Sequence, residues 1–240
     1  MIRIKYIYTN IKVSSRSIAS FTNEDILNPQ NKRRCIKRFT AIRLQKKTLH
    51  LPTQKRHAAV LVPLCYVNNE LALLYTLRAA DLKSHRGQIS FPGGIQDYGD
   101  KTFIDTALRE TNEELGIPKD EVEIWCQSKT IDTPSKTSVT PVVGLIKNPN
   151  ISELIVKNPK EVEDFFFVPL TTLCKPENCR YTQFRRNYST PAFLGAPRRI
   201  WGLTAIITHL FLLSLMPKDC YQHVIKFTPT IEFTYEKKKN

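Results

Sequence analysis

The chain has 240 residues, of which 41% are hydrophobic and 24% are charged. It is therefore long enough to bury a substantial core and too apolar to be disordered. The formal net charge is +14 at pH 7, yet residues 1–56 hold 14 Lys and Arg against 2 acids and residues 57–240 hold 22 against 20. Because a duplex-binding body would need a basic stripe of its own, the overall charge is only weak evidence for nucleic-acid binding.

The first 23 residues contain no acid, several Ser and Thr, and four basic residues: Arg3, Lys5, Lys12 and Arg16. This composition is typical of a mitochondrial transit peptide. We therefore assign residues 1–25 to a transit peptide and predict a mitochondrial location, with a disordered basic tail as the alternative. Residues 26–56 continue as a basic N-terminal segment, in which we expect a helix with a solvated basic face.

Residues 57–217 carry the predicted folded domain, followed by a C-terminal extension at 218–240. Apolar runs predict strands at 58–66, 71–77, 122–131 and 139–145, and helical spacing predicts helices at 102–115 and 201–216. Asn68 and Asn69 predict a turn that joins the first two strands into a hairpin. The run at 201–216 is shorter than the ~20 residues needed to cross a bilayer, so we expect a buried helix and no transmembrane segment. This order predicts an α+β fold in which helices cover both faces of a mixed sheet.

The cysteines and histidines do not indicate a metal site or a disulfide framework. No Cys-x-x-Cys pair is present, and no nearby His completes a zinc pattern, so we expect reduced thiols. His57, His209 and His223 have no second ligand at helical spacing and are expected to make local hydrogen bonds.

Three glutamates lie close together on the helix predicted at 102–115. Glu110, Glu113 and Glu114 are related as i, i+3 and i+4, which puts them near one face. Like charges at this spacing cost about 0.2–0.5 kcal/mol per pair. A hard cation such as Mg²⁺ or Mn²⁺ would remove that cost, because these ions prefer oxygen ligands. These glutamates are therefore candidate metal ligands; a solvated acidic face is the alternative.

A basic stretch precedes a Gly-Gly turn just before this helix. Cations beside exposed backbone N–H groups can form a phosphate site. The candidate substrate-binding residues are Arg78, Lys83, Arg86, Gly93 and Gly94. An exposed basic loop is the alternative.

The combination of a Gly-rich turn, Asp100 and the run RETNEELG at 109–116 resembles the box of the Nudix hydrolases. The segments LLYTLR at 73–78 and GQISFPGG at 87–94 resemble the additional signature of the coenzyme A diphosphatase branch of that family. An Asp stands where the box usually has Glu, and one extra residue precedes Arg109, which is also a feature of this branch. Ala79 and Lys83 replace a Ser and an Arg of the signature, and Lys lacks the bidentate geometry of Arg.

The resemblance covers residues 57–217 and implies the Nudix fold, an α/β/α sandwich with a loop–helix–loop that binds a divalent metal. It implies hydrolysis of coenzyme A and acyl-coenzyme A to adenosine 3′,5′-bisphosphate and 4′-phosphopantetheine or its acyl form, with Mg²⁺ or Mn²⁺ as cofactor. Glu110 and Glu114 would be metal ligands, and Glu113 a third ligand or the general base. Arg109 would orient the glutamates through an ion pair. Glu161 and Glu163 are the alternative bases.

Two other functions are compatible with the sequence. One is a Nudix hydrolase for another nucleoside diphosphate derivative, such as ADP-ribose or NADH. The other is a non-catalytic RNA-binding or scaffold protein with a degenerate box, which the basic segment favours and the intact glutamates disfavour. The basic residues at 30–56 could also contact an anionic membrane surface. We expect small-molecule partners and no nucleic acid, and we predict no particular oligomeric state.

Overall fold

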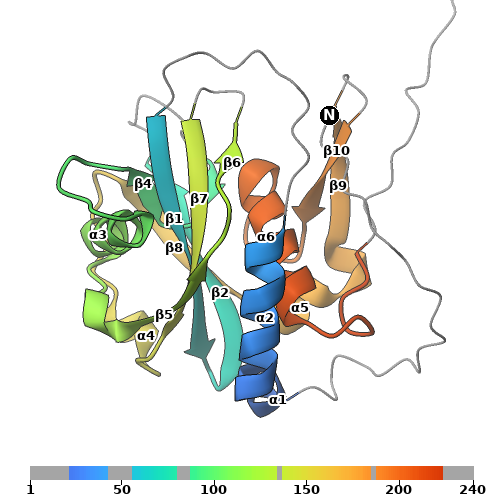
Figure 1. Ribbon diagram of the computed structural model, residues 1–240. Coiled ribbons are helices and arrows are strands. Elements are labelled where there is room, and N and C mark those ends of the chain that lie inside the picture. The colour runs from blue at the N-terminus through green and yellow to red at the C-terminus, as the bar shows by residue number, and fades with distance from the viewer. Residues whose placement is uncertain (1–21, 43–55, 80–86, 134–136, 185–187, 224–240) are drawn as a thin grey trace, which may run out of the picture.

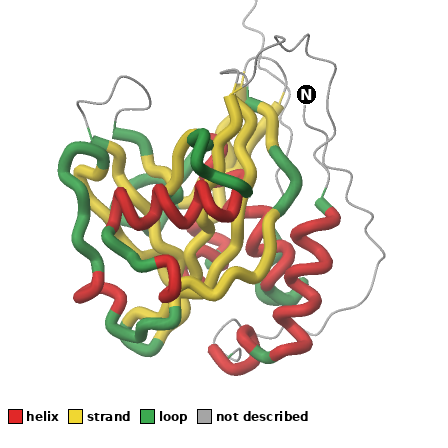
Figure 2. The backbone as a smooth tube through the Cα atoms, turned by 60° about the vertical axis from the view of Figure 1, so that its left-hand side comes forward, coloured by secondary structure: helices red, strands yellow, loops and turns green. Residues whose placement is uncertain are grey.

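The structure is a computed structural model that describes residues 22–42, 56–79, 87–133, 137–184 and 188–223. A mixed sheet forms the centre of the molecule, and helices lie on either side of it (Figures 1 and 2). The sheet contains β1 (Arg56–Val67), β2 (Glu70–Arg78), β3 (Ile89–Ser90), β4 (Gly93–Ile95), β5 (Val122–Gln127), β6 (Ile131–Asp132), β7 (Thr137–Ile146) and β8 (Val162–Pro169). The helices are α1 (Asn23–Leu27), α2 (Pro29–Ala41), α3 (Phe103–Leu115), α4 (Ile151–Leu154), α5 (Leu170–Cys174) and α6 (Gly202–Leu215), with 3₁₀ turns η2 (Lys119–Glu121) and η3 (Pro176–Asn178). A separate hairpin consists of β9 (Cys179–Phe184) and β10 (Tyr188–Phe193).

The sheet separates two hydrophobic cores. Because strand side chains alternate between faces, Leu73 and Tyr75 of β2 enter one core and Leu74 enters the other. The first core also contains residues of α2 and α6, and the second contains Ala107 and Leu115 of α3. Pairing within the sheet is parallel between β1 and β7 and antiparallel between β1 and β2. The predicted α+β fold, an α/β/α arrangement with a mixed sheet, is therefore confirmed.

The helix predicted at 102–115 is α3, and its ends follow from its sequence. The Thr102 hydroxyl oxygen accepts a hydrogen bond from the Asp105 N–H, and the Asp105 carboxylate accepts one from the Thr102 N–H. These two reciprocal hydrogen bonds form a capping box. Gly116 ends the helix at φ 69°, a left-handed conformation that favours glycine. The local sequence thus fixes both ends of the helix that carries the glutamates.

The single strand predicted at 122–131 is wrong, because the chain forms two strands there, β5 and β6. Both pair with β7 on either side of Pro141. Proline has no N–H to donate, so the ladder cannot run unbroken past this residue. The Pro141 carbonyl instead accepts a hydrogen bond from the Ser128 N–H at 2.8 Å, in the gap between the two strands.

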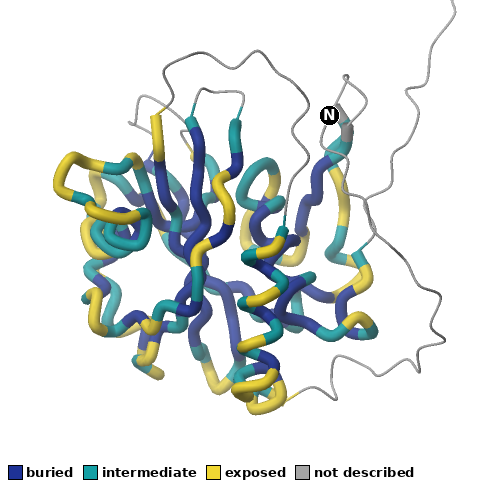
Figure 3. The backbone as a smooth tube through the Cα atoms, viewed as in Figure 1, coloured by how far each residue is buried: buried dark blue, intermediate teal, exposed yellow. Residues whose placement is uncertain are grey.

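Part of the basic N-terminal segment packs into the fold. In α2, Cys35 and Phe39 are buried one turn apart, and Phe39 meets Phe211 of α6 edge to face at 6.1 Å. Arg33 and Lys37 remain exposed, as predicted for a solvated basic face. Figure 3 shows that α2 has both exposed and buried positions. The first core therefore contains residues on both sides of the expected domain boundary at 57. It also contains Cys220 and Tyr221, which lie beyond the expected boundary at 217. Residues 1–21 of the predicted transit peptide and 43–55 of the basic segment lie outside the described residues.

The helix predicted at 201–216 is α6, and most of its residues are buried, as expected. Within the described ranges, no helix is long and apolar enough to cross a membrane. All six cysteines lie within the described residues and carry thiols, in agreement with the prediction of reduced cysteines.

His209 of α6 is buried, and its Nδ1 lies 2.7 Å from the Tyr221 hydroxyl. Burial, assisted by the neighbouring His223, lowers the pKa of His209 from 6.5 to about 3. Below pH 6.5 the unfolded chain therefore binds a proton that the folded chain does not, so stability should fall as pH falls, by at most about 1.4 kcal/mol per pH unit. In urea unfolding at pH 7, 6 and 5, the wild type should lose stability more steeply than His209→Gln, which can still bond Tyr221 but does not titrate. Equal slopes would contradict this prediction.

Candidate active site

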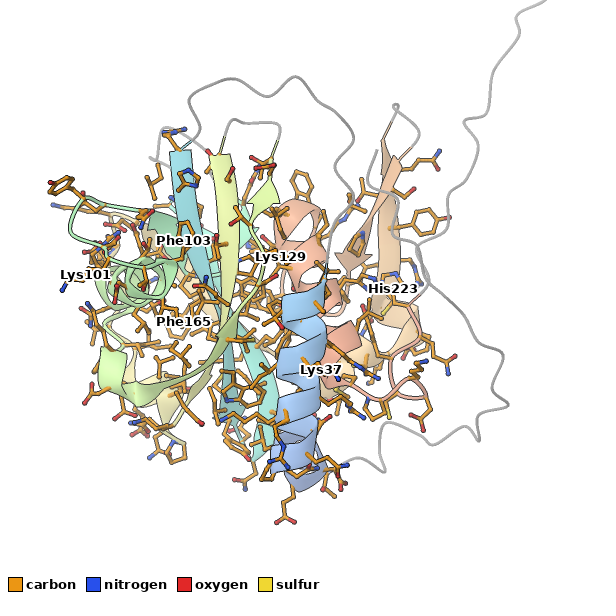
Figure 4. All side chains as sticks on the ribbon, viewed as in Figure 1. Lys37, Lys101, Phe103, Lys129, Phe165 and His223 are labelled. Atoms are coloured by element: carbon orange, nitrogen blue, oxygen red, sulfur yellow. The ribbon has the colours of Figure 1, made fainter. Side chains whose placement is uncertain are left out.

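Three carboxylates converge beside the Gly-Gly turn of β4. Glu110 and Glu114 lie one turn apart on α3, and Glu161 comes from the turn that leads into β8. Each can offer an oxygen atom such that these atoms all lie within 4.8 Å of one another. Phe103 of α3 and Phe165 of β8, which are labelled in Figure 4, pack against the same hydrophobic core. The arrangement therefore joins one helix and one distant loop into a single acidic group.

Glu114 is the most buried member of this group, with 1% of its surface exposed. Its Oε2 accepts a hydrogen bond from the Gly93 N–H at 3.2 Å, and its Oε1 lies 3.3 Å from Nη1 of Arg78. Burial raises the pKa of Glu114 to about 8, although Arg78 and the Gly93 N–H favour the ionised form. Burial also raises the pKa of Glu110, against the opposing effect of Arg109. The positive charge near these two carboxylates therefore does not offset the cost of burying them in the ionised form.

Arg109 organises the acids around the cluster. Its guanidinium lies 2.8 Å from Asp100 Oδ2, 3.0 Å from Glu110 Oε1 and 2.9 Å from Glu113 Oε2. The hydrogen bonds from Arg109 hold the pKa of Asp100 well below its usual range. This geometry agrees with the predicted role of Arg109 in orienting glutamates, and it places Asp100 against Arg109 rather than among the three carboxylates.

Glu113, which the sequence suggested as a third ligand, is not brought into the group. Its side chain is 47% exposed and pairs with Arg109. At about 100° per residue, position 113 lies about 40° from Arg109 but about 100° from Glu114 around the helix. The third member is instead Glu161, which the sequence suggested as a base. Glu163, the other suggested base, is exposed and lies outside the group.

Glu161 reaches the cluster through the sheet. β8 pairs antiparallel with β2 so that Val162 lies opposite Arg78. The Ala79 N–H extends this pairing with a hydrogen bond to the Glu161 carbonyl at 2.9 Å. Long-range strand pairing thus sets the position of Glu161, which no local sequence signal could have linked to the box.

Of the predicted substrate-binding residues, the structure brings Arg78, Gly93 and Gly94 to the cluster, whereas Lys83 and Arg86 lie outside the described residues. A Cβ at Gly94 would collide with the Glu110 carboxylate, and a Cβ at Gly93 would collide with the Ala59 carbonyl. In the structure the two glycines therefore make room for the glutamate and for the neighbouring strand.

The cluster suits a divalent metal ion. In the described part of the chain, two guanidinium groups face five carboxylates: Asp100, Glu110, Glu113, Glu114 and Glu161. Oxygen-only ligands with an excess of negative charge favour a hard cation such as Mg²⁺ or Mn²⁺. A cation would also offset the cost of keeping Glu114 buried and ionised. The donor set therefore fits the metal that the box implies.

Comparison with known proteins agrees with this geometry. The NUDIX domain model matches residues 55–188, which is more than half of the chain. The chain therefore belongs to the Nudix hydrolase family and is an enzyme, as predicted.

Several relatives place it within that family. The chain is 42% identical over 180 residues to a human protein named mitochondrial coenzyme A diphosphatase NUDT8, covering 73% of this chain and 75% of the relative. The mouse protein of the same name is 40% identical over 179 residues, covering 72% and 85%. Nudix hydrolase 3 of Caenorhabditis elegans is 32% identical over 235 residues, covering 89% and 97%. These similarities place the chain in the branch that contains the NUDT8 proteins.

Proposed function

We propose that this chain hydrolyses the diphosphate of coenzyme A and acyl-coenzyme A with Mg²⁺ or Mn²⁺. The products would be adenosine 3′,5′-bisphosphate and 4′-phosphopantetheine or its acyl form. The observation that carries the proposal is the convergence of Glu110, Glu114 and Glu161 in a chain whose relatives are named coenzyme A diphosphatases. The names of the human and mouse relatives also support a mitochondrial location, together with the acid-free composition of residues 1–23.

Each residue of the site has a chemical task in this proposal. Glu110, Glu114 and Glu161 would hold the cation, which supplies charge neutralisation at the diphosphate and lowers the pKa of a bound water. Glu161, which comes from the turn rather than the helix, is assigned a second task in addition to holding the cation, which is to accept the proton of the attacking water. Arg78, beside Glu114, stabilises the phosphate charge that develops during hydrolysis. Arg109 holds Glu110 in place, and Glu113 acts through Arg109.

Additional positive charge would come from the loop before the Gly-Gly turn. Lys83 and Arg86 are proposed to contact the remaining phosphate groups of the substrate, since that substrate carries a 3′-phosphate as well as the diphosphate. This assignment distinguishes coenzyme A from ADP-ribose and NADH, which lack the 3′-phosphate.

A substrate panel tests the proposal. Purified protein should hydrolyse coenzyme A and acyl-coenzyme A with a kcat/KM about tenfold or more above that for ADP-ribose or NADH, a difference of about 1.4 kcal/mol in transition-state binding. Mass spectrometry should identify the two expected products, and EDTA should stop the reaction. A clear preference for ADP-ribose, or turnover that persists in EDTA, would refute the proposal.

A further inference from the structure

We infer that Asn158 is a positioning residue whose side-chain amide holds Glu161 within the carboxylate cluster. Its Nδ2 donates a hydrogen bond to Glu161 Oε1 at 3.2 Å. Within the described ranges, this is the side-chain hydrogen bond that reaches the Glu161 carboxylate. The catalytic part of the inference rests on the proposed function, whereas its structural part rests on the geometry of the cluster.

The backbone of Asn158 connects the two halves of the site. Its N–H donates to the Glu114 carbonyl at 2.9 Å, at the end of α3, where helix carbonyls lack partners within the helix. Its own carbonyl accepts hydrogen bonds from the N–H groups of Glu161 at 3.0 Å and Val162 at 2.8 Å. One residue therefore bonds the helix that bears Glu114 and closes the turn that bears Glu161.

The orientation of the amide is also determined. Asn158 Oδ1 accepts a hydrogen bond from the Lys160 N–H at 3.1 Å. A backbone N–H can only donate, so the oxygen must face Lys160 and the NH₂ group must face Glu161. The amide cannot flip without losing both hydrogen bonds.

Glu161 needs this support because it is the least constrained member of the cluster. It lies on a turn, only partly buried, and faces the like charges of Glu110 and Glu114. Repulsion favours conformations in which its side chain leaves the group, and the hydrogen bond from Asn158 favours the one in which it stays. Loss of such a partner of a metal-binding carboxylate reduces affinity or activity by about 10- to 100-fold.

Asn158→Asp separates positioning from a merely structural role. The Asp can still accept the Lys160 hydrogen bond and retain the turn, but it presents an anionic oxygen to Glu161 instead of a donor. Asn158→Ala removes both contacts. The matched control is Asn148→Asp, since Asn148 Oδ1 accepts a hydrogen bond from the Asn150 N–H at 2.8 Å in an exposed turn. Each full-length variant would be assayed for kcat and KM with coenzyme A, for Mn²⁺ affinity by EPR, and for metal-free Tm.

We expect Asn158→Asp to lower kcat and weaken Mn²⁺ binding, each by about tenfold or more, with KM and metal-free Tm close to wild type. Asn148→Asp should resemble the wild type in every measurement. The inference would be overturned if Asn158→Asp kept the wild-type Mn²⁺ affinity and kcat. It would also be overturned if the losses in kcat and Mn²⁺ affinity were explained by a lower metal-free Tm. If the wild type proves inactive on coenzyme A, the proposed function fails, whereas weaker Mn²⁺ binding by Asn158→Asp would still support the positioning role.

Discussion

Glu114→Gln is expected to abolish metal-dependent turnover without weakening the fold. The glutamine keeps the volume of the buried side chain and an oxygen for the Gly93 N–H. It loses the charge that a cation requires, so kcat/KM should fall about 10³-fold or more, equivalent to several kcal/mol of transition-state stabilisation. Because burial raises the pKa of this carboxyl to about 8, the metal-free site holds it largely uncharged at pH 7, so the pairing with Arg78 contributes little and the metal-free Tm should stay close to that of the wild type.

Two measurements make this prediction specific. Mg²⁺ should raise the Tm of the wild type, because a ligand that binds only the folded state stabilises it, and this increase should be much smaller in Glu114→Gln. Glu153→Gln, on the exposed surface of α4, is the matched control and should keep full activity. Turnover that survives in Glu114→Gln would show that Glu114 is not a metal ligand.

Gly94→Ala should disable the site, whereas Gly93→Ala should damage the fold. A Cβ at Gly94 would occupy the space of the Glu110 carboxylate and displace it from the cluster. Since misplacement of a catalytic group by about 1 Å can cost about 10²-fold, we expect at least that loss in kcat with a nearly unchanged Tm. Gly93 has φ 150°, and its Cβ would meet the Ala59 carbonyl of the neighbouring strand, so the Ala variant should lose about 3 kcal/mol or more of stability.

The two adjacent glycine variants are expected to differ in which property they lose. Urea unfolding measures the free energy of unfolding of each variant, and kcat with saturating coenzyme A measures the activity of its site. Gly99→Ala serves as the control, because a Cβ there would meet no atom within 4 Å. An active Gly94→Ala, or a Gly93→Ala variant as stable as the wild type, would contradict the assigned roles.

Much of the local structure was predictable from the sequence. Asn68 and Asn69 both adopt positive φ, 50° and 62°, in the hairpin turn that their identities suggested. The helix predicted at 102–115 forms as α3 between Thr102 and Gly116, and the i, i+4 spacing of Glu110 and Glu114 brings these two carboxylates together. Capping, turn and helix spacing depend on neighbouring residues, so the sequence carries this information directly.

The rest of the site depends on contacts between distant segments. Glu161 joins Glu110 and Glu114 because β8 pairs with β2 in one register, and Glu113 leaves the group because Arg109 attracts it. Likewise, β5 and β6 separate because Pro141 lies in the strand opposite them. The family, the helix and two of its acids could be inferred from residue order alone, since motifs and helical spacing involve residues that are close in the chain. The third acid and its partner Asn158 could be identified only in the folded protein, because strand register and competition between ion pairs are established when distant segments pack together.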